Sequence, residues 1–308
     1  MADPVLQLEG VSKLFGDFHA VENISFTVPA GCVLGFLGPN GAGKTTTIRM
    51  ILDILRPSHG RITILGATTA LPVRHRLGYL PEEKGLYRKM KSWAIIAHFA
   101  ALKGLSLRAA RQRAFELLER YGLQDFAHSR AEQLSKGMGQ KVQVLASIAH
   151  DPELVILDEP FSGLDPVNQI VLEEIIHDLK RRGRTVIFST HVMPHAERLC
   201  DHLVIMARGH KVFDGTVAAA RRTLPIRLRL QTADSIEPLR RLPEVSTLSA
   251  TPDGFWELDL VDEVDAQPVL EACFTHHIRL RRFNTLEPTL HDVFVKLVGP
   301  DAGEAVRR

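Results

Sequence analysis

The spacing of apolar residues changes several times along the chain, and each spacing predicts a different kind of structure. From Val5 to Val28 apolar and polar residues alternate around a turn signal at Gly16-Asp17, which predicts an antiparallel β layer. From Ser92 to about Leu123 apolar residues recur at helical spacing. Continuous apolar runs, which are typical of buried parallel strands, occur at Cys32–Leu37, Leu154–Leu157 and Thr185–Ser189. Together these patterns predict an α/β domain with an antiparallel β subdomain and a helical subdomain at about 88–150.

Turn residues and helix breakers place the remaining elements of this first part. A helix is expected after Gly43 that ends near Leu55, followed by a strand from Arg61 to Leu65. We expect Gly78 to Glu83 to be a loop, because Pro81 blocks the continuation of a helix or a central strand. The later elements are a helix capped by Ser135 that runs to about His150, a helix from Val167 to Arg182, and a hairpin from Asp201 to Gly215.

The pattern changes at Thr223-Leu224-Pro225, where we expect a domain boundary. After it, apolar and polar residues alternate strictly from Ile226 and again from Phe255, and a short strand is expected at Ile278–Arg282. Helical patterns lie at about 235–241, 266–276 and 286–298. This order predicts a small α+β, ferredoxin-like module, in which we find no catalytic constellation. The expected domains are therefore 1–222, 223–298 and a polar tail at 299–308.

The stretch from Gly38 to Thr46 carries the most specific chemical signal. It follows an apolar strand, precedes a helix and fits the pattern G-x-x-x-x-G-K-[ST]. Its glycines let successive N–H groups face inward as an anion nest, and the helix N-terminus adds the positive end of a dipole. Lys44 would reach the β- and γ-phosphates, and the Thr45 hydroxyl would ligate Mg²⁺. We predict a nucleoside triphosphate site formed by Gly38, Pro39, Asn40, Gly41, Ala42, Gly43, Lys44, Thr45 and Thr46.

Further chemical groups are expected at the same edge of the sheet. Asp158 and Glu159 end a buried apolar run, and ligands of doubly wound sheets lie at the C-terminal ends of the strands. The next run ends at Ser189 and delivers His191 to this edge. Upstream of the phosphate loop, Phe15 is either a platform for an adenine ring or a core aromatic of a hairpin, and the residue alone does not decide between the two.

Composition and charge indicate in which compartment the protein works and which classes of partner it has. The 308 residues carry a net charge of +2, which gives no electrostatic case for a nucleic-acid partner. The three cysteines are far apart and odd in number, which argues against a disulfide framework and suits a reducing cytoplasm. The first residues do not form a signal peptide, and no run approaches the roughly 18 apolar residues of a membrane span. We expect a soluble protein whose membrane role comes through a partner.

Five motifs occur in a fixed order along the first domain. They are the phosphate loop, a signature segment Leu134-Ser135-Lys136-Gly137-Met138 at a helix start, the strand end Asp158-Glu159, the turn Ser162-Gly163-Leu164-Asp165, and the strand end at His191. This order resembles the ATP-binding subunits of ABC transporters over about residues 4–222. The signature segment and Pro160 look most like the bacterial export subgroup whose membrane subunit is a separate chain. The C-terminal module is similar to an extension found on some of its members. The resemblance implies a P-loop NTPase core with a mostly parallel sheet.

The resemblance also assigns roles within one subunit. It implies that the loop amides and Lys44 hold the phosphates of ATP, while Thr45 and Asp158 bind Mg²⁺. It further implies that Glu159 is the general base that polarises the attacking water. Apart from this proton transfer, the reaction mainly needs positioning of the phosphates and neutralisation of their charge. His191 would contact the γ-phosphate.

Other roles involve the adenine ring and a second subunit. The resemblance makes Phe15 the adenine-stacking residue. Ser135 and Gly137 would serve the ATP of the partner subunit across a head-to-tail dimer, with Asp165 at the interface. A helix N-terminus with a free hydroxyl and exposed amides is an anion site, and Ser135 can be an ordinary N-cap at the same time.

Two residues depart from the family pattern. Glu82 stands where the family usually has a glutamine that senses Mg²⁺ and the membrane subunit. A carboxylate can still ligate Mg²⁺, so tighter metal binding or altered coupling is expected. Lys136 replaces the usual first glycine of the signature segment, and its ammonium could help to bind a γ-phosphate or point to solvent.

These observations lead to a hypothesis of an ATPase that powers a membrane exporter. The expected partners are a separately encoded transmembrane permease subunit and either a second copy of the chain or a related ATPase subunit. Such a complex would place the chain at the cytoplasmic face of the cell membrane. A surface at Trp93–Phe99, with Ile95, would either receive the membrane partner or pack inside the helical subdomain. The alternative is a soluble ABC-type ATPase acting on ribosomes or DNA, but neither a second ATPase domain nor an inserted coiled coil is present.

Overall fold

The structure, a computed structural model, describes residues 3–83, 85, 87–261 and 266–299. It divides into two compact units, which are Val217–Leu297 and the remainder of the chain on either side. The division after Thr216 falls a few residues before the predicted boundary at 222. Most of the expected polar tail, 299–308, lies outside the described residues.

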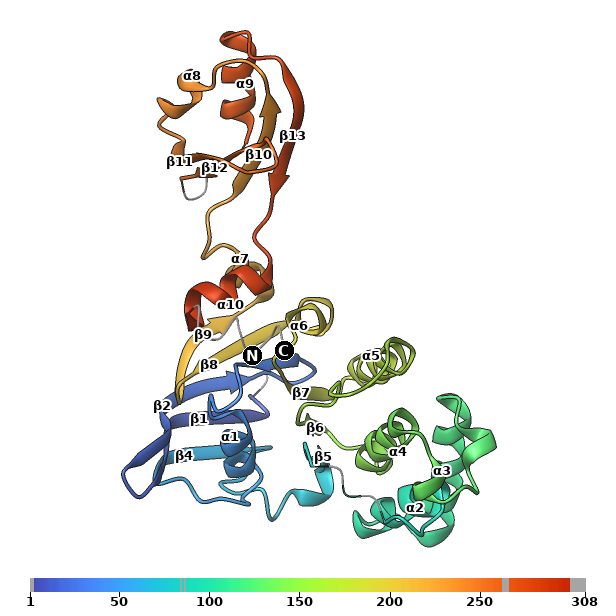
Figure 1. The fold of residues 1–308 in the computed structure, drawn as a ribbon. Coiled ribbons are helices and arrows are strands. Elements are labelled where there is room, and N and C mark those ends of the chain that lie inside the picture. The colour runs from blue at the N-terminus through green and yellow to red at the C-terminus, as the bar shows by residue number, and fades with distance from the viewer. Residues whose placement is uncertain (1–2, 84, 86, 262–265, 300–308) are drawn as a thin grey trace. The chain divides into compact units, whose positions relative to one another are not determined.

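A mostly parallel sheet forms the centre of the larger unit (Figure 1). Its strand order is β5-β6-β7-β3-β8-β9, and all neighbours are parallel except β8 and β9, which form the predicted hairpin. Strands β3, β6 and β7 are buried along their whole length, which explains why their sequences are continuous apolar runs. The strands are β3 (Val33–Leu37), β5 (Leu77–Leu80), β6 (Leu154–Leu157), β7 (Thr185–Thr190), β8 (His202–Ala207) and β9 (His210–Gly215).

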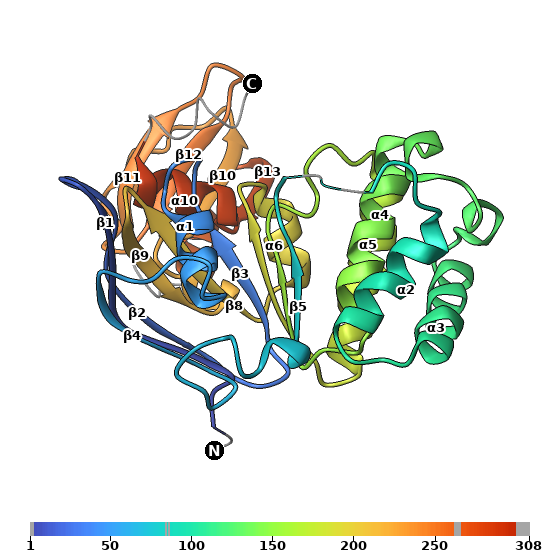
Figure 2. The ribbon, with the colours of Figure 1, turned by 90° about the horizontal axis from the view of Figure 1, so that it is seen from below.

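An antiparallel sheet of order β2-β1-β4 packs on the side of helix α1 that faces away from the parallel sheet (Figure 2). Phe26 of β2 and Phe36 of β3 pack with their ring centroids 5.9 Å apart, and Ile48 of α1 belongs to the same buried cluster. This shared core holds the start of α1 against the end of β3, where the phosphate loop lies. The elements are β1 (Leu6–Phe15), β2 (Phe18–Val28), β4 (His59–Ile64) and α1 (Lys44–Ile51).

The helical subdomain is formed by α2, α3 and α4, and it is joined to α5 of the core (Figure 2). The buried Tyr121 hydroxyl, after α3, donates to Asp178 Oδ2 of α5 at 2.8 Å and fastens the subdomain to the core. Among the described helices, none combines the length and apolar character that crossing a membrane requires. The helices are α2 (Ser92–Leu102), α3 (Leu107–Arg120), α4 (Lys136–Ile148), α5 (Pro166–Arg181) and α6 (Met193–Leu199), with 3₁₀ turns at Arg74–Arg76, Gln124–Phe126 and Ala131–Gln133.

The smaller unit contains a βαββαβ arrangement with an antiparallel sheet of order β11-β12-β10-β13. This order confirms the predicted ferredoxin-like topology. One face of the sheet packs against the helices through a buried cluster that includes Leu228, Leu258 and Val269. The elements are α7 (Val217–Arg221), β10 (Arg227–Thr232), α8 (Glu237–Arg240), β11 (Val245–Ala250), β12 (Trp256–Leu260), α9 (Gln267–Thr275), β13 (Leu280–Leu286) and α10 (Leu290–Val298).

One sequence-based expectation about the fold is wrong, one strand was not expected, and one open alternative is decided. Gly78, Tyr79 and Leu80 belong to strand β5, and only the residues from Pro81 on lie in a loop, because the strand ends before the proline is reached. Strand β11 was not expected from the sequence. Ile95 is fully buried in the helical subdomain, so it cannot contribute to a partner surface.

Candidate functional site

The phosphate loop between β3 and α1 depends on a glycine immediately before the helix. Gly43 has a φ of 98°, in the left-handed region that glycine adopts without strain. A Cβ at this position would lie 2.7 Å from the carbonyl oxygen of Ala20, which is too close. The backbone can therefore turn sharply into α1, whose first N–H groups have no partners within the helix and form a site for anions.

Lys44 is held across the loop by backbone carbonyls. Its ammonium donates hydrogen bonds to Gly38 O at 2.6 Å and to Pro39 O at 3.2 Å, and it lies 3.6 Å from Glu159 Oε1. The side chain is buried, and burial lowers the pKa of Lys44 while the charges of Glu159 and Asp158 oppose this effect. The positive charge is thus placed over the loop in a partly water-excluded position, where it interacts strongly with anions.

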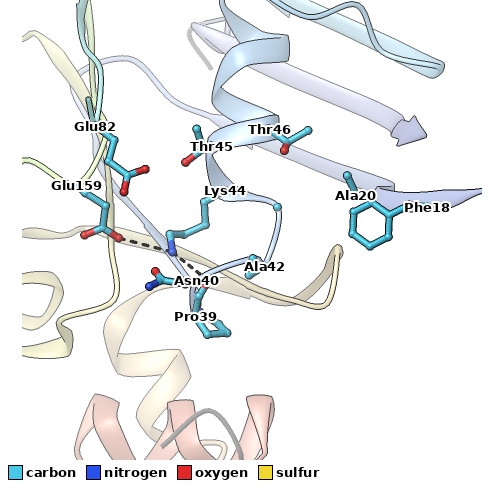
Figure 3. Close-up of a pocket in the computed structure, with 12 residues that line it drawn as sticks. Phe18, Ala20, Pro39, Asn40, Ala42, Lys44, Thr45, Thr46, Glu82 and Glu159 are labelled. Carbon is cyan, nitrogen blue, oxygen red and sulfur yellow. Dashed lines mark hydrogen bonds and ion pairs between the residues drawn. The ribbon is translucent and has the colours of Figure 1, made fainter. Parts of the chain in front are cut away.

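The loop lines a pocket of about 300 Å³ (Figure 3). Figure 3 shows Lys44 pointing from α1 toward Glu159, with Glu82 near Glu159 on the same wall. The lining residues are Phe18, Ala20, Pro39, Asn40, Gly41, Ala42, Gly43, Lys44, Thr45, Thr46, Glu82 and Glu159. Residues 39–46 of the predicted loop therefore share one pocket with two carboxylates from other elements.

Asp158 lies at the end of β6 with its carboxylate fully buried. Ser189 Oγ donates to Asp158 Oδ1 at 2.5 Å, whereas Asp158 Oδ2 has no hydrogen-bond partner of acceptable geometry among the described residues. Burial raises the pKa of Asp158, and the hydroxyls of Ser189 and then Thr45 lower it. A buried carboxylate oxygen without a partner, near a threonine hydroxyl, is an oxygen donor set of the kind that Mg²⁺ prefers. The residues present fit this ion.

Glu159 lies between two basic side chains. His191 Nδ1 is 3.1 Å from both of its carboxylate oxygens, and Lys44 Nζ is 3.6 Å from Oε1. The hydrogen bond to Glu159 raises the pKa of His191, while burial opposes this effect. Glu159 has a φ of 46°, a conformation that is unusual for a residue other than glycine and that is often found at functional sites.

Glu82 and Glu83 lie in different surroundings. Glu82 lines the phosphate-loop pocket, whereas Glu83 lines a separate groove together with Tyr79 and Phe99. Glu82, which departs from the family pattern, therefore lines the same pocket as Lys44 and Thr45, whereas Glu83 lines the neighbouring groove.

The aromatic residues near the pocket form a pair at the tip of the β1–β2 hairpin. Phe15 and Phe18 are opposite each other in the strand register. Phe18 lines the pocket, while Phe15 is 49% exposed and has Lys13 Nζ 5.2 Å from its ring centroid. Within the described residues, the pocket wall thus includes Phe18 but not Phe15.

Ser135, Gly137 and Asp165 lie apart from this pocket, at the starts of α4 and α5. Ser135 Oγ accepts a hydrogen bond from Met138 N at 3.2 Å, which confirms it as the N-cap of α4. Asp165 caps α5 and accepts from Asn168 N at 2.9 Å. As far as the structure describes the chain, none of the three lines the phosphate-loop pocket, and the side chains of Ser135 and Asp165 are exposed.

Sequence reasoning missed Ser189, which connects the Asp158 carboxylate to the backbone of Glu159. Ser189 Oγ accepts a hydrogen bond from Glu159 N at 2.8 Å and donates to Asp158. It fixes the end of β6 against the end of β7. The signal in the sequence is the pair of hydroxyl residues Ser189 and Thr190 at the end of a buried apolar run, which is too general to identify this role.

Comparisons with known proteins connect this site to a family. The ABC transporter family profile matches residues 21–162, and the profile of the ATP-binding protein DrrA1-3-like C-terminal domain matches residues 220–298. An uncharacterized ABC transporter ATP-binding protein of Bacillus subtilis (strain 168), YhaQ, is 38% identical over 296 residues, covering 96% of this chain and 99% of that protein. The linearmycin resistance ATP-binding protein LnrL of the same organism is 32% identical over 312 residues, covering 96% of this chain and 98% of that protein.

The fold is also similar to solved structures. An ATP-binding subunit of an ABC transporter superposes with a TM-score of 0.66 at 33% sequence identity, covering 71% of this chain and 92% of that one.

Proposed function

The chain belongs to the family of ABC transporter ATP-binding proteins, and on that premise we propose that it powers export through a separately encoded membrane subunit. It is an ATP-binding protein and an ATPase. Proteins of this kind pair with transmembrane components and form dimers. Our proposal concerns the residues that carry the reaction, the partner subunit and the direction of transport.

The observation that carries the proposal is the position of Glu159 beside the phosphate loop. It lines the pocket and contacts both Lys44 and His191. A carboxylate held in place beside the phosphate loop can accept a proton from an attacking water. We assign Glu159 as the general base, and Lys44 with the loop amides as the groups that hold and neutralise the phosphates. His191 orients Glu159 and contacts the γ-phosphate.

Thr45 and Asp158 are the proposed ligands of Mg²⁺, with Glu82 as a further carboxylate on the same pocket wall. When bound there, the ion would neutralise charge on the β- and γ-phosphates. Within the chain, Ser189 holds Asp158 and the backbone of Glu159 in place. Ser189 thus fixes the ends of the two strands that carry Asp158 and Glu159.

A second subunit completes each ATP site in this proposal. Ser135 and Gly137 stand at a helix N-terminus that is outside the subunit's own pocket, and Asp165 is exposed at the next helix start. Helix N-termini bind anions, so this surface suits the γ-phosphate held by the loop of another subunit. In a head-to-tail dimer, the start of α4 of each subunit would face the phosphate loop of the other, which gives two composite ATP sites.

The membrane subunit has a suitable docking place in a mostly apolar groove of about 270 Å³. Its wall takes in Leu80, Pro81 and Glu83 at the end of β5, and Phe99 of α2. The groove begins directly beside Glu82, so a partner seated there could sense the state of the ATP site. This groove replaces the surface expected around Ile95, while Phe99 remains part of it.

Export is supported by the name of one relative, LnrL. LnrL is named for resistance to linearmycin, and removal of a compound from the cell is one route to resistance. The alternative of a ribosome- or DNA-associated ATPase is not favoured by any relative named above.

Copurification from membranes tests the proposal. Affinity-tagged full-length protein should recover a multi-span membrane protein from detergent-solubilised membranes, and inverted vesicles containing the pair should take up the exported compound with ATP. Recovery of ribosomal RNA instead of a membrane protein would contradict the proposal, and ATP-driven loss of compound from inverted vesicles would contradict export.

A further inference from the structure

The starts of α4 and α5 fit together at a position where a side chain is missing. Gly137, in the first turn of α4, is buried against the side chain of Asn168 in the first turn of α5. A Cβ on Gly137 would lie 2.3 Å from Asn168 Nδ2 and 2.9 Å from its Cγ. The carboxamide of Asn168 therefore occupies the space that any other residue at 137 would need.

Asn168 is in turn held by the residue that caps its own helix. Asn168 N donates to Asp165 Oδ1 at 2.9 Å, and Asn168 Nδ2 donates to Asp165 Oδ2 at 2.6 Å. A cap needs only the first of these bonds. The second bond fixes the side-chain rotamer of Asn168, and with it the face that is presented to Gly137.

Two other contacts join the same segments. Gln140 Nε2 of α4 donates to Pro160 O at 3.3 Å in a buried position, one residue after Glu159. The Lys136 side chain covers Gly163, where a Cβ would lie 2.5 Å from Lys136 Nζ. The start of α4 is thus matched along its first turns to the segment that runs from Pro160 to Asn168.

We propose that Asn168 is a positioning residue that locks the start of α4, with Ser135 and Gly137, to the Asp165 turn. The start of α4 and the Asp165 turn, which are both proposed to face the second subunit, then form one rigid surface. Its shape is set before the two subunits associate. This inference rests on the proposed head-to-tail dimer and adds to it a residue outside every motif of the sequence. Its effect is on dimerisation and turnover, because Asn168 does not line the ATP pocket as far as the chain is described.

A donor–acceptor exchange tests the side-chain bond itself. Asn168→Asp replaces Nδ2 with an oxygen that faces Asp165 Oδ2, so the bond is lost and two carboxylates repel each other. An acidic residue in the first turn of a helix is favourable, so the fold is expected to be retained. Adding Asp165→Asn restores a donor on the other side, and asparagine is a good N-cap. The exchanged pair should therefore recover what the single variant loses.

The measurement is the dissociation constant of the ATP-bound dimer by analytical ultracentrifugation, in full-length protein carrying Glu159→Gln. We expect Asn168→Asp to weaken this dimer about tenfold or more. Asp165 lies at the proposed interface, so Asp165→Asn is measured alone as well, and the exchanged pair should dimerise more tightly than either single variant. ATP affinity at concentrations where the protein is monomeric should be unchanged. Glu174→Ala, on the exposed face of α5, is the matched control and should dimerise like the parent.

Three results would overturn the inference. Asn168→Asp could dimerise like the parent, or the exchanged pair could be no tighter than the single variant. Equal losses of monomer ATP affinity and dimer affinity would mean that Asn168 has a merely structural role. Failure of the Glu159→Gln parent to dimerise is a different result, because it removes the proposed dimer and this inference with it.

Discussion

His191 Nδ1 lies 3.1 Å from both carboxylate oxygens of Glu159. The histidine follows β7 and the glutamate follows β6, so two adjacent parallel strands bring the pair together. Lys44 contacts the same carboxylate from the phosphate loop. The base assigned to ATP hydrolysis is thus oriented by residues from two other motifs.

The ion pair between His191 and Glu159 should be visible in the titration of the imidazole. Because the hydrogen bond to Glu159 raises its pKa, His191 should titrate above 6.5, and Glu159→Gln should bring its pKa down. The stability that the pair contributes is then fully present below pH 6.5 and is lost as pH rises through the raised pKa. Ring-proton NMR of the histidines measures this directly.

His150 supplies an internal control for that titration. Burial lowers its pKa to about 4, its Nε2 lies 3.0 Å from Leu77 O, and the charged groups that act on it are Lys103, Asp151 and His75. Its titration should be the same with and without Glu159→Gln. A His191 pKa that does not move in the variant would contradict the pairing.

Removal of the Asp158 charge should uncouple ATP binding from the metal. Asp158→Asn keeps an oxygen that can accept from Ser189, but it removes the charge at the buried Oδ2. We expect ATP affinity with Mg²⁺ to fall about tenfold or more, and ATP affinity in EDTA to stay the same. Because a buried, charged carboxylate oxygen without a partner costs stability, the metal-free variant should also melt at a higher temperature. Unchanged Mg²⁺-dependent binding, measured by calorimetry, would rule out Asp158 as a ligand.

Glu82 and Glu83 form a matched pair for testing the departure from the family pattern. Glu82→Gln should raise the Mg²⁺ concentration that gives half-maximal ATPase activity, by about threefold or more, because a neutral amide binds the ion more weakly than a carboxylate. Glu83→Gln, which faces the neighbouring groove, should leave it unchanged. Equal effects of the two substitutions would remove Glu82 from the proposed site.

The two aromatic residues at the hairpin tip should differ in their effect on ATP binding. Loss of a stacked ring weakens binding of a base about tenfold, and we expect this loss for Phe15→Ala. Phe18→Ala should cost less, because the resemblance to the family assigns the stacking role to Phe15, although Phe18 lines the pocket. The test is ATP affinity compared with affinity for inorganic triphosphate, which has no base. A loss confined to Phe18→Ala would transfer the stacking role to Phe18.

The parts of the site that could be predicted from sequence are those with a signal in one short stretch, which are the phosphate loop and the strand ends that carry Asp158, Glu159 and His191. The phosphate loop is recognisable because its spacing, its strand and its helix lie within one short stretch. Ser189 could not be predicted, because its role depends on two strands being adjacent in space. Asn168 escaped notice for the same reason, since its partner Gly137 lies on another helix.

The two strands that were missed show where alternation and turn signals fail. The loop expected from Gly78 on rested on Pro81, yet Gly78 lies within β5, where a Cβ would be 2.5 Å from Ser147 O of α4. The glycine permits a close approach of helix and strand. In β11 a register shift between Val245 and Thr247 interrupts the pairing with β12, so apolar residues do not recur at every second position.

The most direct test of the account is the behaviour of purified Glu159→Gln with ATP and Mg²⁺. Without its general base the protein should still bind ATP, hydrolyse it at least about a hundredfold more slowly, and accumulate as a dimer. Turnover and mass are measured on the same sample, by phosphate release and light scattering, beside the wild-type protein. Hydrolysis at the wild-type rate would show that Glu159 is not the base, and a slow variant that stays monomeric would contradict the ATP-driven dimer.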